Sequence, residues 1–314
     1  MRLKHWLIVI VVIIVLPLLI QSPYHRYVLT MAGIFSILAI GLNFLMGLCG
    51  QISLAHAAFW GIGAYVSSLL VIRLNVPFPL AVLGAGIFGL IIGVLLGIPS
   101  LKLKGFYLAI TTLGFGQIVN LVLNNWIPVT RGADGLPGIP APSIGPWVFS
   151  SNLSKYYVIM VIFLIVLYMF EKIKNSRVGR AIQAIRDNEL AAEAMGVNTR
   201  YYKVLSFALS SFVAALAGSA LAHFVGYISP DNFLSQQSFT TICMLILGGS
   251  GTTWGPVIGA SLLVVLPEWL RFLKNYYIAI YGLAVVIIAI KMPTGIVGLF
   301  KSKFSNFSRS SAKK

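Results

Sequence analysis

The sequence predicts an all-α polytopic membrane protein with about ten (eight to ten) transmembrane segments, some of them broken or re-entrant. Hydrophobic residues make up 58% of the 314 residues and charged residues only 10%, whereas a soluble domain carries about 25% charged residues. The stretch between Arg26 and Arg73 contains no charged residue at all. At about 1.5 Å per residue it can cross roughly two hydrocarbon cores of about 30 Å each.

Apolar segments indicate where the chain crosses the membrane. The first, residues 6–20, follows a basic start like that of a signal peptide. No small-residue cleavage site comes after it, so we expect an uncleaved span. The other apolar segments are 28–48, 54–72, 78–98, 105–125, 156–170, 204–224, 238–248, 255–267 and 276–290. Several are short for a crossing, which favours broken or re-entrant helices and leaves a count of eight to ten, with ten preferred.

The basic residues predict the orientation of the spans. Ten crossings place these groups on one side: Arg2, Lys4, Lys102, Lys104, the loop 171–203 and the tail 291–314. Because positive charge marks cytoplasmic loops, we expect this side and both termini in the cytoplasm. The turn 266–275, basic but on the other side, fits this orientation least well. The net charge of +16 is therefore assigned to topology and to contact with membrane lipid, not to nucleic acid.

Residues 126–154 are expected on the extracytoplasmic side. This loop is rich in Pro and Gly, a composition that excludes a regular helix, and its length suggests a structured cap. Such a cap suits a binding partner on that face or a rigid connector, and the sequence favours neither.

The loop 171–203 is predicted to contain two short helices. Val178, Ile182 and Ile185 recur at i, i+4 and i+7, which places an apolar stripe on the first helix. Paired amphipathic helices in a basic loop suggest a segment that another protein binds and moves. The alternative is a helix that lies on the lipid headgroups.

The second short helix is expected over residues 190–195. Asp187 or Asn188 can cap its start, and Gly196 suits its C-terminal stop. Its alanines are Ala191, Ala192 and Ala194. Their small side chains favour close docking of a protein over insertion into lipid.

Two polar or irregular segments are candidates for a translocation path. The first consists of Gly50, Gln51, Ser53 and His56. Polar groups between glycines in an apolar segment are typical of a substrate path, although Gly and Ser can also serve only to bring helices together.

The second candidate segment is 247–256, whose path residues are Gly248, Gly249 and Gly251. Its four glycines and one proline predict irregular backbone between two short helices. At membrane depth such backbone is tolerated only where it is buried or lines a cavity, and the helix ends can then face a polar solute. It is not a nucleotide site, because the chain contains no Gly-Lys dipeptide.

These motifs resemble the branched-chain amino-acid permeases of ABC importers, LivM type. The matching segments are 50–54, 61–65, 104–115, 132–136, 179–181, 184–186 and 191–192, together with Gly196. The resemblance extends over about residues 28–299. One departure is Ala55, where the family is expected to have Gly before His56.

The resemblance implies a single permease domain over residues 1–314 that imports Leu, Ile and Val across a bacterial cytoplasmic (inner) membrane. It implies a second, homologous permease, an extracytoplasmic solute-binding protein, and separate ATPase subunits that bind the ATP. No cofactor, metal or catalytic residue is implied here. The residues implied in ATPase coupling are Gly179, Arg180, Arg186, Asn188, Ala191, Ala192 and Gly196. Similar permeases import urea or short amides, and no residue excludes these substrates.

Two other classes fit less well. Ion-coupled secondary transporters usually hold Asp or Glu inside the membrane, whereas all seven acids here fall in loops or at span ends. A membrane-embedded enzyme needs converging His, Asp or Glu, and none converge in this sequence. Cys49 and Cys243 lie in apolar surroundings without metal-ligand spacing or a disulfide framework.

Overall fold

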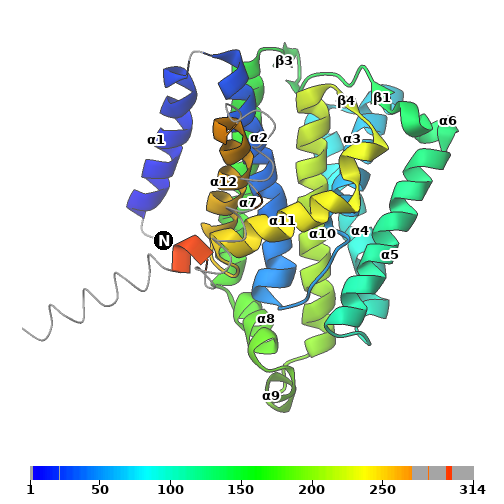
Figure 1. The fold of residues 1–314 in the computed structure, drawn as a ribbon, viewed down its shortest axis with the longest axis vertical. Coiled ribbons are helices and arrows are strands. Elements are labelled where there is room, and N and C mark those ends of the chain that lie inside the picture. The colour runs from blue at the N-terminus through cyan, green and yellow to red at the C-terminus, as the bar shows by residue number, and fades with distance from the viewer. Residues whose placement is uncertain (1–2, 21, 271–281, 283–294, 299–314) are drawn as a thin grey trace, which may run out of the picture.

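The computed structural model describes residues 3–20, 22–270, 282 and 295–298, and these form a bundle of helices with short strands at one end (Figure 1). Six of the described helices are long and apolar enough to cross a membrane: Pro23–Leu48, His56–Leu74, Phe78–Ser100, Phe106–Asn125, Asn152–Lys174 and Thr199–Val225. Val9–Leu19 and Gly255–Trp269 are shorter apolar helices. The prediction of an all-helical polytopic protein is confirmed. The expected span 276–290 lies outside the described residues but for 282, so the count of ten stays a prediction.

Most of the helices follow one another with short connections, whereas residues 131–151 separate α6 from α7. Their bounds are α1 (Leu3–Leu19), α2 (Pro23–Leu42), η1 (Asn43–Leu48), α3 (His56–Leu74), α4 (Phe78–Ser100), α5 (Phe106–Asn125), α6 (Ile127–Thr130), η2 (Gly132–Asp134), α7 (Asn152–Lys174), α8 (Arg177–Asp187), α9 (Glu189–Ala194), α10 (Thr199–Val225), η3 (Pro230–Phe233), α11 (Ser235–Gly248) and α12 (Gly255–Leu270). In Figure 1, α8 and α9 lie at one end of the bundle and the strands at the other. We call these the α9 end and the strand end.

The charge-free stretch is not one straight helix, as its glycines predicted. α2 continues into η1, a π-helix, and the chain leaves the helix at Cys49 and re-enters one at His56. Just after the helix ends, the amide of Gln51 donates a hydrogen bond to the carbonyl of Leu45 at 3.1 Å. A π-helical turn leaves backbone groups differently paired from those of an α-helix and is frequent at functional sites.

α10 lies at the centre of the bundle, against α2, α3 and α4. Small residues allow this close approach: a Cβ at Gly63 on α3 would overlap the backbone of Ala215 on α10. A Cβ at Gly93 on α4 would overlap the side chain of Ser211. In a membrane, where apolar burial drives association weakly, such contact between small residues is a main source of helix packing.

α11 and α12 are joined by residues 249–254, which form no helix, so the predicted irregular backbone between two short helices is confirmed. α11 crosses the bundle obliquely (Figure 1). The two helices touch through glycine, since a Cβ at Gly248 would overlap the carbonyl of Gly255 and one at Gly259 would overlap that of Met244.

The strand end is built from two loops. β1 (Leu136–Pro137) pairs antiparallel with β4 (Tyr227–Ile228), and β2 (Ser143–Ile144) pairs with β3 (Trp147–Val148). Below them, buried His223 on α10 bonds the carbonyl of Pro140 through Nδ1 at 2.8 Å. Its Nε2 lies 2.7 Å from the hydroxyl of Ser67 on α3. A carbonyl only accepts, so Nδ1 carries the proton and Ser67 donates to Nε2.

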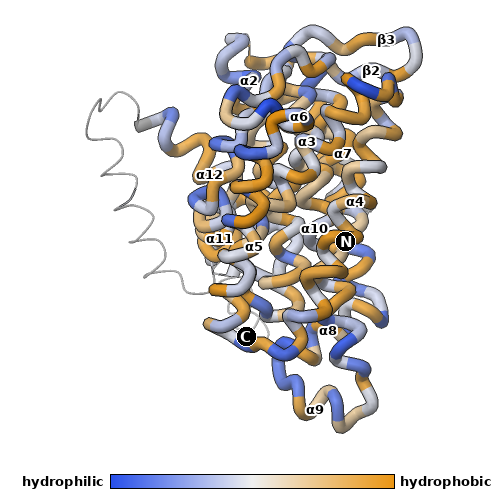
Figure 2. Tube along the Cα trace, turned by 90° about the vertical axis from the view of Figure 1, so that its right-hand side faces the viewer, coloured by the Kyte–Doolittle hydropathy of each residue, from blue (hydrophilic) through white to orange (hydrophobic). Residues whose placement is uncertain are grey.

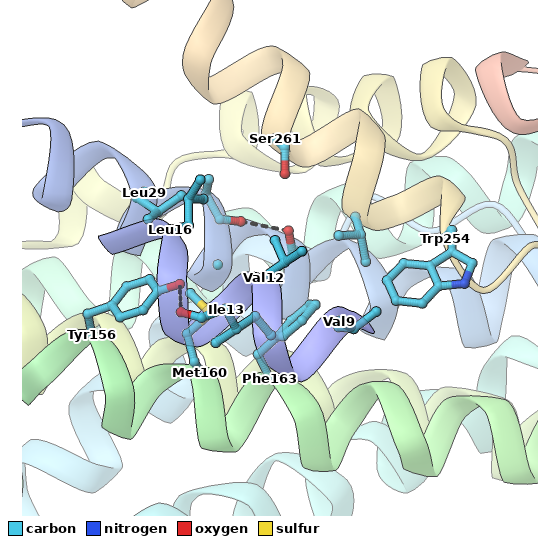
Figure 3. A pocket seen from close by; sticks show the side chains of 14 residues that line it. Val9, Val12, Ile13, Leu16, Leu29, Tyr156, Met160, Phe163, Trp254 and Ser261 are labelled. Carbon is cyan, nitrogen blue, oxygen red and sulfur yellow. Dashed lines mark hydrogen bonds between the residues drawn. The ribbon is translucent and has the colours of Figure 1, made fainter. Parts of the chain in front are cut away.

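α1 stands at the edge of the bundle and encloses with α2, α7 and α12 an apolar cavity of about 260 Å³ (Figure 3). Pro17 within α1 has no N–H, so the carbonyl of Ile13 loses its helical donor. The hydroxyl of Tyr156 on α7 replaces that donor at 3.1 Å (Figure 3). Arg26 bonds the carbonyl of Ile20 at 2.7 Å beyond the end of the helix. Both bonds satisfy backbone groups that lipid cannot.

Candidate functional site

α8 and α9 form a hydrophilic arm that projects from the bundle, as the hydropathy colouring in Figure 2 shows. Ile182 and Ile185 are buried beneath α8, so the predicted apolar stripe is confirmed. Ser176 caps the helix by accepting from the amide of Gly179 at 3.3 Å. A Cβ at Gly179 would overlap the last carbonyls of α7, so this residue lets α8 fold back directly against α7.

The start and stop of α9 follow the predicted pattern. Asn188, not Asp187, caps the helix: its Oδ1 accepts from the amide of Ala191 at 3.1 Å. Gly196 ends it with φ +81°, a conformation that glycine adopts without a Cβ penalty. Ala192 faces inward and is buried, whereas Leu190 is 74% exposed.

An ion-pair cluster ties α9 to the bundle. Glu189, the first residue of α9, accepts a short hydrogen bond from Lys203 on α10 and pairs with Lys104 at 3.2 Å. Burial by itself raises the pKa of Glu189, but the bonds from the two lysines outweigh burial and hold this pKa below its ordinary value. Lys203 is only 5% exposed, and removal of its partner would therefore leave a buried charge unpaired.

Arg186 connects α8 to both candidate path segments. Its Nη1 donates to the carbonyl of Gly47 in η1 at 2.8 Å. A Cβ at Gly50 would lie 2.7 Å from Arg186 Cγ, and one at Gly251 would lie 2.9 Å from Nη1. Arg186 thus occupies a narrow space between the two segments. Arg180 instead lies on the exposed side and bonds only the carbonyl of Asn175, at 3.2 Å, among the described contacts.

The second path segment is joined by Asn43 to η1, the helix that leads into the first; Asn43 is fully buried. Its Oδ1 accepts from the amide of Gly251 at 2.8 Å, and its Nδ2 donates to the carbonyl of Thr252 at 2.8 Å. Lys174 at the end of α7 donates to the carbonyl of Gly251 at 2.6 Å. The irregular 249–254 segment is therefore held by α7 and η1 together.

The remaining path candidates divide between packing and a cavity. His56 is buried and bonds the carbonyl of Leu38 at 2.8 Å. The hydroxyl of Ser53 accepts from the amide of Ala55 at 3.3 Å. Gly248 and Gly249 bring α11 against α12. Gln51 lines a polar cavity of about 160 Å³ near the α9 end. Gly50 and Gly251 therefore lie beside Arg186. His56 instead makes its hydrogen bond to Leu38.

Sequence reasoning missed two connecting groups. Asn43 is the lone amide side chain in the mostly apolar run between Arg26 and Gly50, and this was a usable signal. The pairing of Glu189 with Lys203 joins residues on different helices and leaves no local pattern. Among the described residues, no group of three or more His, Cys, Asp or Glu is arranged to hold a metal ion.

Comparison with known proteins identifies the family. A family model described as branched-chain amino acid transport system / permease component matches residues 25–290. The high-affinity branched-chain amino acid transport system permease protein LivM of Escherichia coli K12 is 32% identical over 291 residues, 85% of this chain and 68% of LivM. LivH of the same strain is 28% identical over 294 residues, 86% of this chain and 92% of LivH.

A more distant similarity reaches a sugar transporter. The ribose import permease protein RbsC of Haemophilus influenzae is 25% identical over 273 residues, 84% of this chain and 82% of RbsC. No solved structure matches the chain significantly. Since the family model covers most of a multi-pass helical bundle, this chain belongs to the permease components of branched-chain amino acid ABC transport systems, the membrane-spanning subunits that lack an ATPase of their own.

Proposed function

We propose that this chain imports leucine, isoleucine and valine as one half of a permease pair, driven by separate ATPase subunits and supplied by an extracytoplasmic binding protein. Its similarity to both LivM and LivH supports pairing with a second, homologous permease. The α9 end is proposed to face the cytoplasm of a bacterial inner membrane, together with both termini. The loop 126–154 is then extracytoplasmic and available to the binding protein.

The observation that carries the coupling proposal is an exposed apolar tip on a hydrophilic arm. Leu190 in α9 and Met195 directly after it are 74% and 84% exposed, and α9 lies farthest from the bundle in Figures 1 and 2. A helix lying on headgroups would lie level with the ends of the spans, not beyond them. Exposed apolar side chains rimmed by polar residues are typical of a protein-docking site. We assign the ATPase contact to this tip, with Ala191 and Gly196 beside it.

Movement of the docked arm is proposed to reach the path through Arg186. This side chain bonds Gly47 and lies against Gly50 and Gly251, so a shift of α8 must displace η1 or the 249–254 segment. Gly179 and Asn188 hold the arm in shape, whereas Arg180 supports its outer face. The proposed path follows these broken segments, with Gln51, Ser53 and His56 on one side. Gly248 and Gly249 lie on the other side.

The decisive experiment is uptake by the assembled complex in proteoliposomes. Labelled leucine should accumulate in the vesicles when ATP is present on the side of the membrane that carries the ATPase subunits. Accumulation should stop when ATP is removed and only a proton gradient is kept. Uptake that follows the gradient without ATP would contradict the proposal. Competition by isoleucine and valine, but not by urea or acetamide, separates the proposed substrates from the alternative of urea and short amides.

A methionine-to-cysteine change tests the docking site directly. Met195→Cys is expected to form a crosslink to an ATPase subunit in the complex. Ser150→Cys at the strand end, which is also exposed, is the matched control and should form none. Crosslinking to lipid alone at position 195 would remove the docking role.

A further inference from the structure

One side of α5 is covered by no other described element. The helix is the least buried of the six spans, and it stands at the edge of the bundle opposite α1 (Figure 1). Its exposed residues recur at intervals of three and four, so they lie along one side of the helix. We call this side the α5 face. In the middle of the span it consists of Ile110, Thr111, Gly114, Gln117, Ile118 and Leu121.

Lipid alone does not account for the α5 face. The exposed residues of α4 are all apolar, as contact with hydrocarbon requires. The α5 face instead exposes the amide side chain of Gln117 in the middle of the span. Nε2 of Gln117 donates to the hydroxyl of Ser235 at 3.0 Å, whereas no hydrogen bond described for this chain reaches its Oε1. Hydrocarbon has no donor for that oxygen, so its exposure to lipid is costly.

Gly114 is the second unusual feature of the face. At every other glycine in the six spans, a Cβ would lie within 4 Å of another described atom, but at Gly114 it would meet none. Glycine inside a helix is destabilising relative to alanine, and no described contact within this chain requires it at this position. Glycine in a membrane span is typical of places where a second helix approaches closely.

An amide and an open glycine on one side of a span suit another transmembrane helix. An amide both donates and accepts hydrogen bonds, so it can pair with an amide or a hydroxyl opposite. We propose that the second permease packs on the α5 face, with Gly114 at the closest approach and Gln117 hydrogen-bonded across the contact. The identity of this partner rests on the proposed function, which the similarity to both LivM and LivH supports.

The symmetry of a permease pair predicts which helix lies opposite. Two homologous chains related by an approximate two-fold axis offer the same surface to each other. The partner's counterpart of α5 is therefore expected across the contact. Because Gln117 also bonds Ser235, the first residue of α11, the interface adjoins a helix that leads into the 249–254 segment. Movement of one permease against the other would then act on the proposed path through α11.

The test places the photoreactive amino acid benzoylphenylalanine at position 118 of the assembled complex. Ile118 is 60% exposed, and Ile87 on α4, at 54%, is the matched control in the middle of another span. Position 118 should crosslink to a different chain of the same permease family, identified by mass spectrometry, and position 87 only to lipid. The assignment would be overturned by a crosslink from 118 only to lipid, to residues 276–290 of the same chain or to another copy of this chain. Equal crosslinking from both positions would overturn it as well.

A second variant tests the close approach. Gly114→Phe should fold, because the chain leaves room there, but it should lower the amount of second permease recovered with this chain about tenfold, as steric overpacking does. Val161→Phe, at an exposed position in the middle of α7, is the matched control and should leave recovery unchanged. Gln117→Leu should weaken pairing about threefold, the effect of one hydrogen bond between helices in a membrane. Equal recovery with Gly114→Phe and Val161→Phe would contradict the proposal.

Failure of this proposal and failure of the transport proposal give different results. ATP-driven leucine uptake by a complex of two different permeases, without a crosslink between them from position 118, would overturn only the assignment of the α5 face. A transporting complex that contains this chain as its single kind of permease would contradict the proposed pair itself.

Discussion

Arg186 on α8 and Gly47 in the π-helix η1 are joined by a hydrogen bond of 2.8 Å from a guanidinium to a backbone carbonyl. The bond connects the projecting arm with the point where the long charge-free stretch breaks. Since a guanidinium holds several donors in a rigid plane, the contact fixes both the position and the orientation of α8. It is a direct contact between the arm that carries the proposed ATPase contact and the segment that leads into the proposed path.

Replacement of Arg186 should uncouple transport without loss of the protein. Arg186→Met keeps much of the apolar stem but removes the bonds to Gly47 and Asp187. We expect normal membrane insertion and a loss of ATP-driven uptake of about tenfold, consistent with the loss of one part-buried hydrogen bond from a charged group. Uptake in proteoliposomes is the measurement. Arg180→Met is the control and should retain nearly full activity; equal loss in both variants would contradict the specific role of Arg186.

Asn43 should matter for the stability of the 249–254 segment. Asn43→Leu has a similar volume but leaves the amide of Gly251 and the carbonyl of Thr252 without their partners. Each buried group left unpaired costs about 1–3 kcal/mol, so the thermal unfolding midpoint in detergent should fall. Asn125→Leu is the control, because Asn125 bonds only a carbonyl of its own helix among the described contacts, at 2.8 Å. An unchanged unfolding midpoint for Asn43→Leu would contradict the role of Asn43 in holding the 249–254 segment.

Gly196 should tolerate asparagine far better than leucine. Its φ of +81° is left-handed, and no atom lies within 4 Å of a Cβ built there, so the cost within this chain is backbone strain of about 1–2 kcal/mol. Asparagine adopts this conformation more readily than other side chains. We expect Gly196→Leu to lose uptake through strain and a clash with the docked ATPase, and Gly196→Asn to retain most of it. Full uptake by Gly196→Leu at normal expression would exclude docking at this turn.

Acid should release α9 from α10. Because the pKa of Glu189 is lowered in the folded protein, its stabilising contribution is complete above the unfolded-state pKa of about 4.3 and is lost as the pH falls through the folded value. A nitroxide at Met195 should therefore become more mobile only at pH values below the ordinary glutamate pKa of about 4.3. In Glu189→Gln it should be mobile at every pH tested. Glu193→Gln, on the exposed side of α9, should leave the transition in place.

The orientation of the bundle can be tested with single cysteines. In a background with Cys49 and Cys243 replaced by Ser, Ser150→Cys should react with an impermeant thiol reagent on intact cells, and Glu193→Cys should react only after the membrane is opened. Both positions are exposed, so access decides the result. The reverse pattern would invert the topology and remove the coupling proposal with it.

Local sequence determined the helices and their ends. Apolar runs, the spacing of Ile182 and Ile185, and glycine at position 196 each act within a few residues along the chain, where helical periodicity and backbone sterics are fixed by the residues themselves. The break after η1 and the irregular 249–254 backbone followed from glycine content in the same way. Asp187 and Asn188 both suit the N-cap of α9. Only the folded geometry shows that Asn188 is the cap.

Tertiary structure alone decided which of these features meet. Asn43 and Gly251 are 208 positions apart, Arg186 and Gly47 are 139 apart, and no periodicity links them. Such contacts depend on how whole helices pack, and in lipid that packing comes from the close fit of small residues and not from a hydrophobic pattern along the chain. The sequence alone grouped His56 with its polar neighbours. Helix packing instead places it against the carbonyl of Leu38, a contact that no local pattern indicates.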